Sequence, residues 1–300
     1  QAAASPLGGS APGTPPSCAR VAALVVIGFA PLAICALLGG WFRSVLVAMV
    51  AMHWGSMCAL PSLYYAVDAS CGRGGAAIRF YARTWRDLQA DTEAKVLRGC
   101  ILGIPVLVAA LAGYVAFRCR TYTWALCVGN FNQPIEEFGL APHSIPFRLL
   151  TAAYFTFWNP AVEEFFWRVF LHHELAEAAG YDPHEERHLV AKDGVGPWRS
   201  LLGAVASACP GRAAPLRWGV SAMYASYHLW PIMGVFRSVW WVYAVLGFFG
   251  LMCLGRFLLL LREHPQFGIP AAYVLHVWVD AAFAALALFK IHPYELGEEP

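Results

Sequence analysis

Three pairs of chemically reactive side chains lie inside strongly apolar stretches of the sequence, and the members of each pair are four positions apart. Residues with this spacing lie on the same face of an α-helix. An ionisable side chain at the centre of a bilayer costs at least about 2.5–3.5 kcal/mol, so such residues are normally paired or functional. The pairs are Glu164 with Arg168, Tyr224 with His228 and His276 with Asp280, and Glu163 directly precedes the first pair.

The side chains of these pairs could activate a water molecule for hydrolysis. Ionisable groups that cannot remain solvated in lipid are expected to converge on one polar cavity. There a carboxylate or an imidazole can take a proton from water, and a cationic or hydrogen-bonding group can stabilise the negative charge that develops on a substrate. Glu163 and Glu164 point about 100° apart around a helix, so Arg168 can neutralise one carboxylate and leave the other free.

Each pair also has a structural explanation. The charged residues of the first stretch could lie at a helix end, with their charges reaching the membrane surface. His228 could be a packed core residue, and a buried hydrogen bond between His276 and Asp280 could lock two helices together. On the residues alone these alternatives stay open.

The composition of the whole chain indicates a membrane protein. Of the 300 residues, 59% are hydrophobic and only 13% are charged, whereas soluble domains carry about 25% charged residues. The mean hydropathy of +0.52 agrees. A net charge of +2, without basic blocks, argues against a nucleic-acid partner. The nine cysteines are scattered without a CxxC spacing, which excludes a cysteine zinc cluster and indicates no disulfide framework.

These properties predict an all-α protein, a polytopic bundle of seven or eight transmembrane helices with a central polar cavity. A span requires about 20 apolar residues. Residues 68–98 are predicted to form an amphipathic surface helix, and 180–217 a loop. The predicted spans are 21–41, with a kink at Pro31, 44–67, 99–117, 149–175, interrupted at Asn159 and Pro160, 218–230, 235–261 and 269–290.

Four regions follow from this pattern: a disordered tail over 1–19, the N-terminal membrane helices and surface helix over 20–147, the catalytic helices over 148–290, and a tail over 291–300. Most loop Lys and Arg residues follow the second and fourth spans, which favours a cytosolic N-terminus. The first tail lacks acidic residues, as transit peptides do, but it also lacks their arginines. Both the endoplasmic reticulum and a plastid membrane therefore stay open for this multi-pass protein.

The order of the three motifs resembles that of a known family of intramembrane peptidases. EEFFWR at 163–168 fits EExxxR, YASYH at 224–228 fits [FY]xxxH, and HVWVD at 276–280 fits Hxxx[ND]. In this order they resemble the CAAX protease and bacteriocin-processing family, whose members include type II CAAX prenyl endopeptidases. The resemblance covers about 148–290. It implies a peptidase that acts on a peptide or on a prenylated protein C-terminus, from which the terminal tripeptide is removed.

The resemblance also implies a role for the residues of the first two motifs. Glu163 would be the general base that takes a proton from water, with help from His228. Glu164 would pair with Arg168 and fix the helix and the local charge. No cofactor is required in this mechanism.

In the third motif, His276 and Asp280 would stabilise the oxyanion of the tetrahedral intermediate, and Tyr224 of the second motif would support the site. Many family members carry Asn at the position of Asp280. An ionised Asp cannot donate a hydrogen bond to an oxyanion, so Asp280 would instead hold His276 as a charged donor.

Two other functions remain open at this point. Glu163, His228 and His276 would also make a zinc set with one open position, with Asp280 as a further ligand or as a partner of a ligand. Alternatively, the chain could be a non-enzymatic scaffold or a transporter, because intramembrane acids and histidines also build proton relays.

Overall fold

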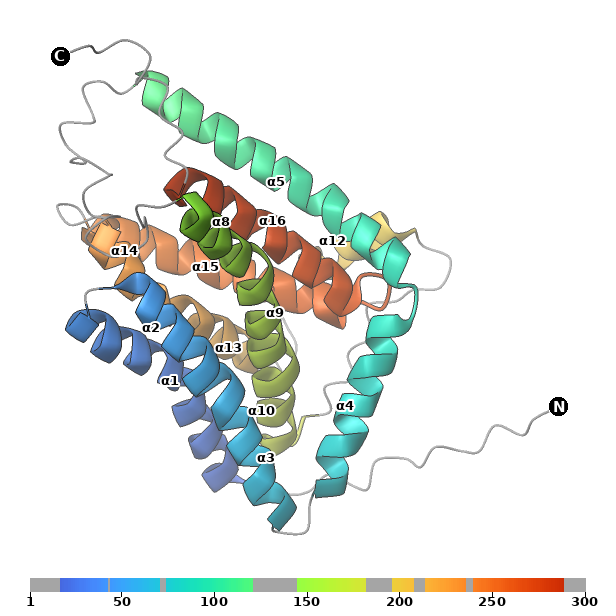
Figure 1. Ribbon diagram of the computed structural model, residues 1–300. Coiled ribbons are helices and arrows are strands. Elements are labelled where there is room, and N and C mark those ends of the chain that lie inside the picture. Colours follow the sequence, from blue (N-terminus) through green and yellow to red (C-terminus); the bar gives the residue numbers. More distant parts are fainter. Residues whose placement is uncertain are drawn as a thin grey trace.

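The computed structural model is built from helices alone within the residues it describes (Figure 1). The all-α prediction is thus confirmed for that part of the chain. The C-terminal tail, nearly all of the N-terminal tail and the polar connector after 120 lie outside it. The described residues are 17–42, 44–70, 74–120, 145–181, 196–207, 214–235 and 240–288.

Five helices of the described residues are long and apolar enough to cross a membrane. Only 17–39% of the residues in their most apolar windows are buried inside the protein, so most of their apolar side chains face outward. Water would not favour such a surface, whereas lipid would. The five segments are Cys18–Gly39, Leu46–Ser70, Thr92–Ala112, Ala244–Glu263 and Gly268–Ala285.

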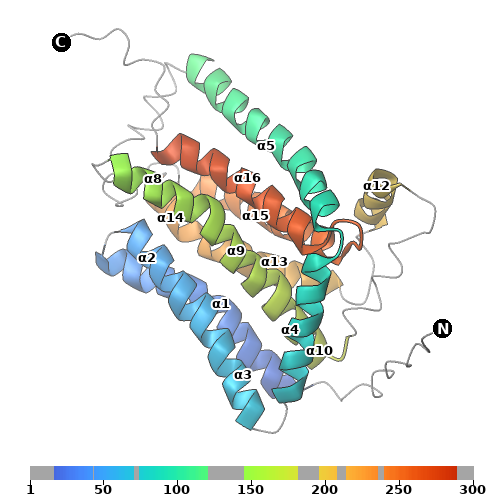
Figure 2. The same cartoon turned by 45° about the vertical axis from the view of Figure 1, so that its right-hand side comes forward.

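The first two predicted spans form the N-terminal side of the bundle. α1 (Cys18–Phe42) contains Pro31 within a continuous helix. α2 (Val45–Ala51) continues through a π-helical stretch, η1 (Met52–Ala59), into α3 (Leu60–Ser70). Both views show α1 beside this second helical course (Figures 1 and 2).

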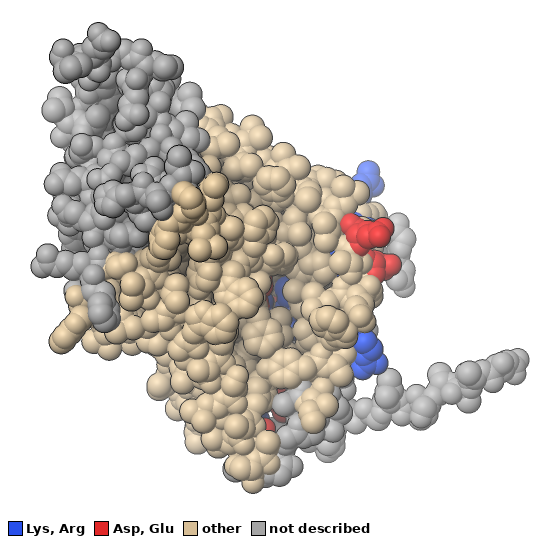
Figure 3. Space-filling model, viewed as in Figure 1, with Lys and Arg blue, Asp and Glu red and all other residues tan. Residues whose placement is uncertain are grey.

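The predicted surface helix over 68–98 is divided between three elements. α3 ends at Ser70, α4 (Gly74–Gln89) forms the separate surface helix, and residues from 92 onward already belong to α5 (Thr92–Arg120). Asp91 turns the chain between α4 and α5 with a φ of 52°. The face drawn in Figure 3 carries few charges, and those in view gather at the right-hand edge, on the side of α4 and α12.

The fourth predicted span is one helical course from 145 to 178 with two π-helical stretches. It comprises α8 (Ile145–Ala153), η2 (Tyr154–Trp158), α9 (Asn159–Glu163), η3 (Glu164–Leu171) and α10 (His172–Ala178). The predicted interruption at Pro160 is a change from π to α geometry and not a break. Pro160 lies in the first turn of α9, where a missing N–H costs little.

The C-terminal part differs from the prediction at its start. The predicted loop over 180–217 is wrong for its second half, because α12 (Pro197–Ser207) is helical and α13 (Ala214–Tyr227) begins four residues earlier than the predicted span. At about 1.5 Å per residue, the 14 residues of α13 are too short to cross a hydrocarbon core alone. α14 (Leu229–Val235), α15 (Trp240–Glu263) and α16 (Gly268–Leu288) follow.

The central course, α8 to α10, lies between the N-terminal helices and the pair α15 and α16 in both ribbon views (Figures 1 and 2). α5 packs along α16, and two glycines four residues apart allow this close approach. A Cβ at Gly99 would lie 2.9 Å from the carbonyl oxygen of Ala271, and one at Gly103 would lie 2.2 Å from the Trp278 ring. α16 is thereby held against α5 on one side and faces the central course on the other.

One end of the bundle, here called the charged end, is fastened by polar contacts between helix termini. Arg20 at the start of α1 forms an ion pair with Glu174 of α10 at 2.8 Å. Arg217 of α13 forms another with Glu263 at the end of α15 at 3.1 Å. Arg98 donates to the carbonyl oxygen of Gln266 in the turn before α16. The start of α1 therefore lies at the same end as the close of the central course.

Candidate functional site

The two adjacent glutamates lie where α9 changes into the π-helical stretch η3, in the middle of the bundle. Glu163 is fully buried, and Glu164 is 2% exposed. A π-helical stretch widens the turn and is frequently found at functional sites. Here it carries Glu164 and Arg168 into the interior together with the apolar residues that surround them.

His276 of α16 contacts both glutamates. Its Nδ1 lies 2.8 Å from Oε1 of Glu164, and its Nε2 lies 3.5 Å from Oε2 of Glu163. Both ring nitrogens thus face carboxylate oxygens, an arrangement that a doubly protonated imidazole satisfies with two donors. The first and third motifs therefore meet in space.

Arg168 pairs with Glu164 and not with Glu163 in the described ion pairs. Its Nη1 lies 3.3 Å from Oε1 of Glu164, and its guanidinium lies over the ring of Tyr224 at 4.1 Å from the centroid. A cation over an aromatic face is stabilised by the ring quadrupole. Glu164 is therefore held by Arg168 and His276 together, and Tyr224 supports Arg168.

Glu163 is the less committed of the two carboxylates. Tyr227 donates its hydroxyl to Oε1 of Glu163. Oε2 of Glu163 has no hydrogen-bond partner among the described residues, although it lies near Nε2 of His276. A buried carboxylate oxygen without a hydrogen bond is unfavourable for stability, which marks Glu163 as the reactive group of the cluster.

Asp280 lies one helical turn beyond His276 and receives hydrogen bonds from the central course. Nδ2 of Asn159 donates to Oδ2 of Asp280 at 2.7 Å, and Oδ1 of Asp280 lies 3.7 Å from Nε2 of His276. An ionised Asp accepts only, so the protein places donors on both sides of this carboxylate. Asp280 links Asn159 to the His276 ring.

His228 is placed differently from the prediction. It lies in the turn between α13 and α14, and its Nδ1 lies 3.0 Å from the carbonyl oxygen of Tyr224. Its ring is 4.0 Å from that of Tyr227, centroid to centroid. Within the described contacts, His228 reaches Glu163 through Tyr227 and not directly, because α13 ends just before it and turns its side chain off the helix face.

Four site residues have no role in the sequence analysis. Tyr227 was hidden beside His228, Asn159 was taken only as a helix interruption, and Tyr154 was one of many aromatic residues. His53 gave the clearest signal, because it is the only ionisable residue in the predicted span 44–67. It is fully buried in η1, and its Nδ1 lies 2.7 Å from the hydroxyl of Tyr154.

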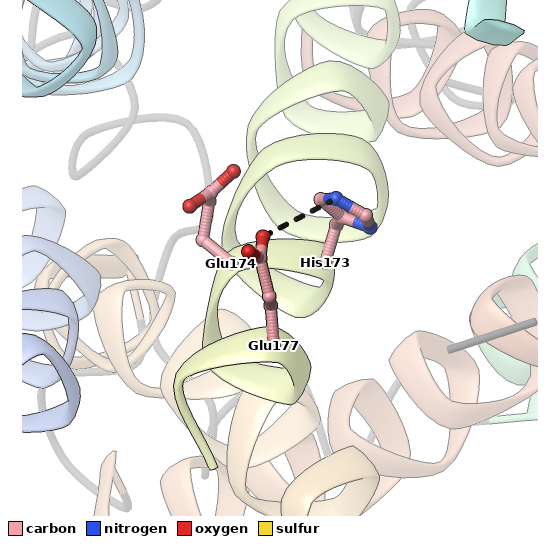
Figure 4. A group of neighbouring side chains, drawn as sticks. All are labelled: His173, Glu174 and Glu177. Carbon is pink, nitrogen blue, oxygen red and sulfur yellow. Dashed lines mark ion pairs between the residues drawn. The ribbon is translucent and has the colours of Figure 1, made fainter. Parts of the chain in front are cut away.

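A metal fits poorly among the three residues that sequence suggested for zinc. Within the described part of the chain, one group of three His or acidic residues has ligand atoms within 4.8 Å of one another, and it is His173, Glu174 and Glu177 at the charged end. In Figure 4, His173 and Glu177 point toward one another while the Glu174 carboxylate points to the other side. Arg20, Tyr64 and Tyr65 donate to that carboxylate.

The three motifs thus meet at one buried cluster, to which α9, η3, α13 and α16 each contribute. Glu163, Glu164, Arg168, Tyr224, His276 and Asp280 are in mutual contact, and Tyr227 connects His228 to them. Searches against family models, curated proteins and solved structures found no match for this chain.

Proposed function

We propose that this chain is an intramembrane endopeptidase that hydrolyses a peptide bond with water activated by Glu163. The observation that carries the proposal is the unequal environment of the two glutamates. Glu164 is neutralised by Arg168 and His276, whereas Glu163 keeps one oxygen free of hydrogen bonds beside the His276 ring. One acid is fixed in place, and its neighbour is left to react.

In the proposed mechanism Glu163 takes a proton from water while the water oxygen attacks the carbonyl carbon of the scissile amide. The carbonyl oxygen becomes an oxyanion, which an N–H of His276 and the hydroxyl of Tyr224 can stabilise. These two groups are 3.5 Å apart, close enough to serve one oxygen. Glu163 then gives the proton to the amide nitrogen, the C–N bond breaks, and a carboxylate and an amine leave.

The positions of the other residues support this division of roles. Arg168 cancels the charge of Glu164, so the site does not hold two uncompensated adjacent carboxylates. Asp280 accepts from Asn159 and faces His276, which suits a residue that keeps the imidazole charged and oriented. Tyr227 carries the influence of His228 to Glu163 through its hydroxyl.

The proposal includes a membrane topology of seven spans around a central polar cavity. The five long apolar helices would be joined by the central course over 145–178 and by α13 with α14, which alternate between the two ends of the bundle. A peptide carrying an isoprenyl chain near its C-terminus suits a site reached from lipid. The motif resemblance favours that substrate class, and the membrane that houses the protein stays unassigned.

The test uses the purified full-length chain in lipid nanodiscs with an internally quenched farnesylated peptide that ends in a CaaX sequence. We expect cleavage that persists in excess chelator. Glu163→Gln should lower kcat by about 10²–10⁴-fold, the usual contribution of a general base. The matched control is Glu177→Gln, a half-exposed glutamate on the same helical course, which should leave kcat unchanged.

Three outcomes would contradict the proposal in different ways. Loss of cleavage in chelator, restored by zinc, would favour a metallopeptidase. Equal activity of Glu163→Gln and the wild type would remove Glu163 from catalysis. Absence of cleavage of the farnesylated peptide and of its unprenylated counterpart by folded wild-type protein would favour a scaffold or a transporter.

A further inference from the structure

His53 lies in the N-terminal half of the chain, yet the structure places it at the edge of the central cluster. It belongs to η1, which packs against α9, the element that carries Asn159 and Glu163. The side chain is fully buried. A buried imidazole in an apolar helix is costly unless its nitrogens are used.

The hydrogen-bonding atoms of His53 and Asn159 complement one another. Nδ1 of His53 is paired with the hydroxyl of Tyr154, and the Asn159 side chain lies within hydrogen-bonding reach of the His53 ring. Nδ2 of Asn159 donates to Asp280. The atoms left without a partner among the described residues are Nε2 of His53 and Oδ1 of Asn159.

The donors and acceptors of this group fit one direction. When the Tyr154 hydroxyl donates to Nδ1 of His53, the ring proton of a neutral imidazole lies on Nε2. Nε2 is then a donor, and Oδ1 of Asn159 is the nearby acceptor. The Asn159 amide is thereby held with its NH₂ group toward Asp280, the orientation that the 2.7 Å bond requires.

We propose that His53 is a positioning residue of the active site, which fixes Asn159 and through it Asp280 and His276. This inference rests on the proposed function for its catalytic consequence. It assigns η1 and α9 a shared task, since a hydrogen-bonded chain runs from Tyr154 through His53, Asn159 and Asp280 to the His276 ring. A displacement of about 1 Å in a reacting group can cost 10²-fold in rate.

The first experiment does not depend on activity. A double-mutant cycle of His53→Phe and Asn159→Ala compares the thermal unfolding of the two single variants and the double variant in nanodiscs. We expect the double variant to lose less stability than the sum of the single variants, because both remove the same link. His264→Phe, which removes a buried imidazole at the charged end, serves as the control and should add to Asn159→Ala without coupling.

The second experiment measures catalysis on the farnesylated peptide. His53→Phe should lower kcat by about 10²-fold with little change in KM, and it should shift the pH profile of kcat because Asp280 and His276 lose their fixed geometry. His53→Gln, whose amide can donate in place of Nε2, should recover most of the loss. Should His53→Phe fail to fold, Tyr154→Phe replaces it and should give a smaller loss in the same direction.

The outcomes separate this inference from the proposed function. Additive losses in the double-mutant cycle would overturn it whatever the activity. Coupled stability together with an unchanged pH profile in His53→Phe would reduce His53 to a packing residue and overturn the positioning role. Coupled stability in a wild-type protein that cleaves neither peptide would support the hydrogen-bonded chain and contradict the proposed function alone.

Discussion

Two buried polar clusters lie in the same bundle, and they are built on different principles. The charged end joins helix termini through ion pairs that match one acid to one base, as Arg20 does with Glu174 and Arg217 with Glu263. The central cluster lies in the middle of the helices and holds more acids than permanent bases. Its ionisable members in mutual contact are Glu163, Glu164, Arg168, His276 and Asp280.

The difference shows which buried charges indicate chemistry. At the charged end, Glu174 accepts from Arg20, Tyr64 and Tyr65, so its carboxylate is satisfied and has no reason to react. In the centre, Glu163 is as buried as its neighbours but keeps an oxygen without a hydrogen bond. Folding does not favour such an oxygen, whereas a reaction with water requires one. Incomplete satisfaction is therefore a better sign of function than burial.

The largest effect that would sharpen this contrast is expected from Arg168→Met. The variant leaves the buried carboxylate of Glu164 without its cationic neighbour, and breaking a buried pair on one side costs about 3–5 kcal/mol. We expect a large loss of unfolding free energy and of activity together. Unfolding of the variant in nanodiscs, followed by tryptophan fluorescence, measures it.

The double variant Arg168→Met with Glu164→Gln is the matched control, because it removes both charges and should recover a substantial part of the lost stability. A double variant no more stable than Arg168→Met would contradict the pairing of these two residues.

An intermediate effect is expected from Glu263→Gln at the charged end. Glu263 accepts from Arg217 and lies 3.5 Å from Nε2 of His172. Loss of this charge should cost about 1–3 kcal/mol of unfolding free energy, the range for a buried group that loses a charged hydrogen-bond partner. Cleavage per folded molecule should stay at the wild-type level. Activity normalised to folded protein measures this, and a loss as large as that of Glu163→Gln would abolish the distinction between the two clusters.

Sequence predicted most of the fold, because lipid-facing helices have a strong signature. Long apolar runs predicted the five spans to within a few residues, and the i, i+4 spacing predicted the partners Glu164–Arg168 and His276–Asp280. Local composition misled at two places. Polar residues around α12 concealed a helix, and Pro160 suggested an interruption where the change to π geometry absorbs its missing N–H.

The remaining site residues could not be predicted, since their roles depend on contacts between distant segments. His53 meets Tyr154 across 101 positions, and Asn159 meets Asp280 across 121. No periodicity within either segment contains that information. The direct assistance of Glu163 by His228 was predicted from motif order, and the termination of α13 just before His228 places Tyr227 in that position.

The smallest effect concerns His264, in the turn between α15 and α16 at the charged end. Burial, together with the nearby Arg98, lowers the pKa of His264. The backbone N–H of Gln266 donates to Nδ1, and Nε2 lies 3.0 Å from the hydroxyl oxygen of Ser200, so the folded protein holds a neutral ring. Below the usual pKa of about 6.5, the unfolded chain binds a proton here that the folded protein excludes.

The contribution of His264 to stability is therefore fully present above about pH 6.5 and declines as the pH falls. We expect the unfolding free energy of the wild type to fall faster between pH 7 and pH 5 than that of His264→Gln, by at most about 1.4 kcal/mol per pH unit. Equilibrium unfolding of both proteins across this range measures the difference. Because Gln cannot titrate but can still contact Ser200, parallel curves would show that this turn exchanges no proton on folding and that the charged end holds its imidazole charged as readily as neutral.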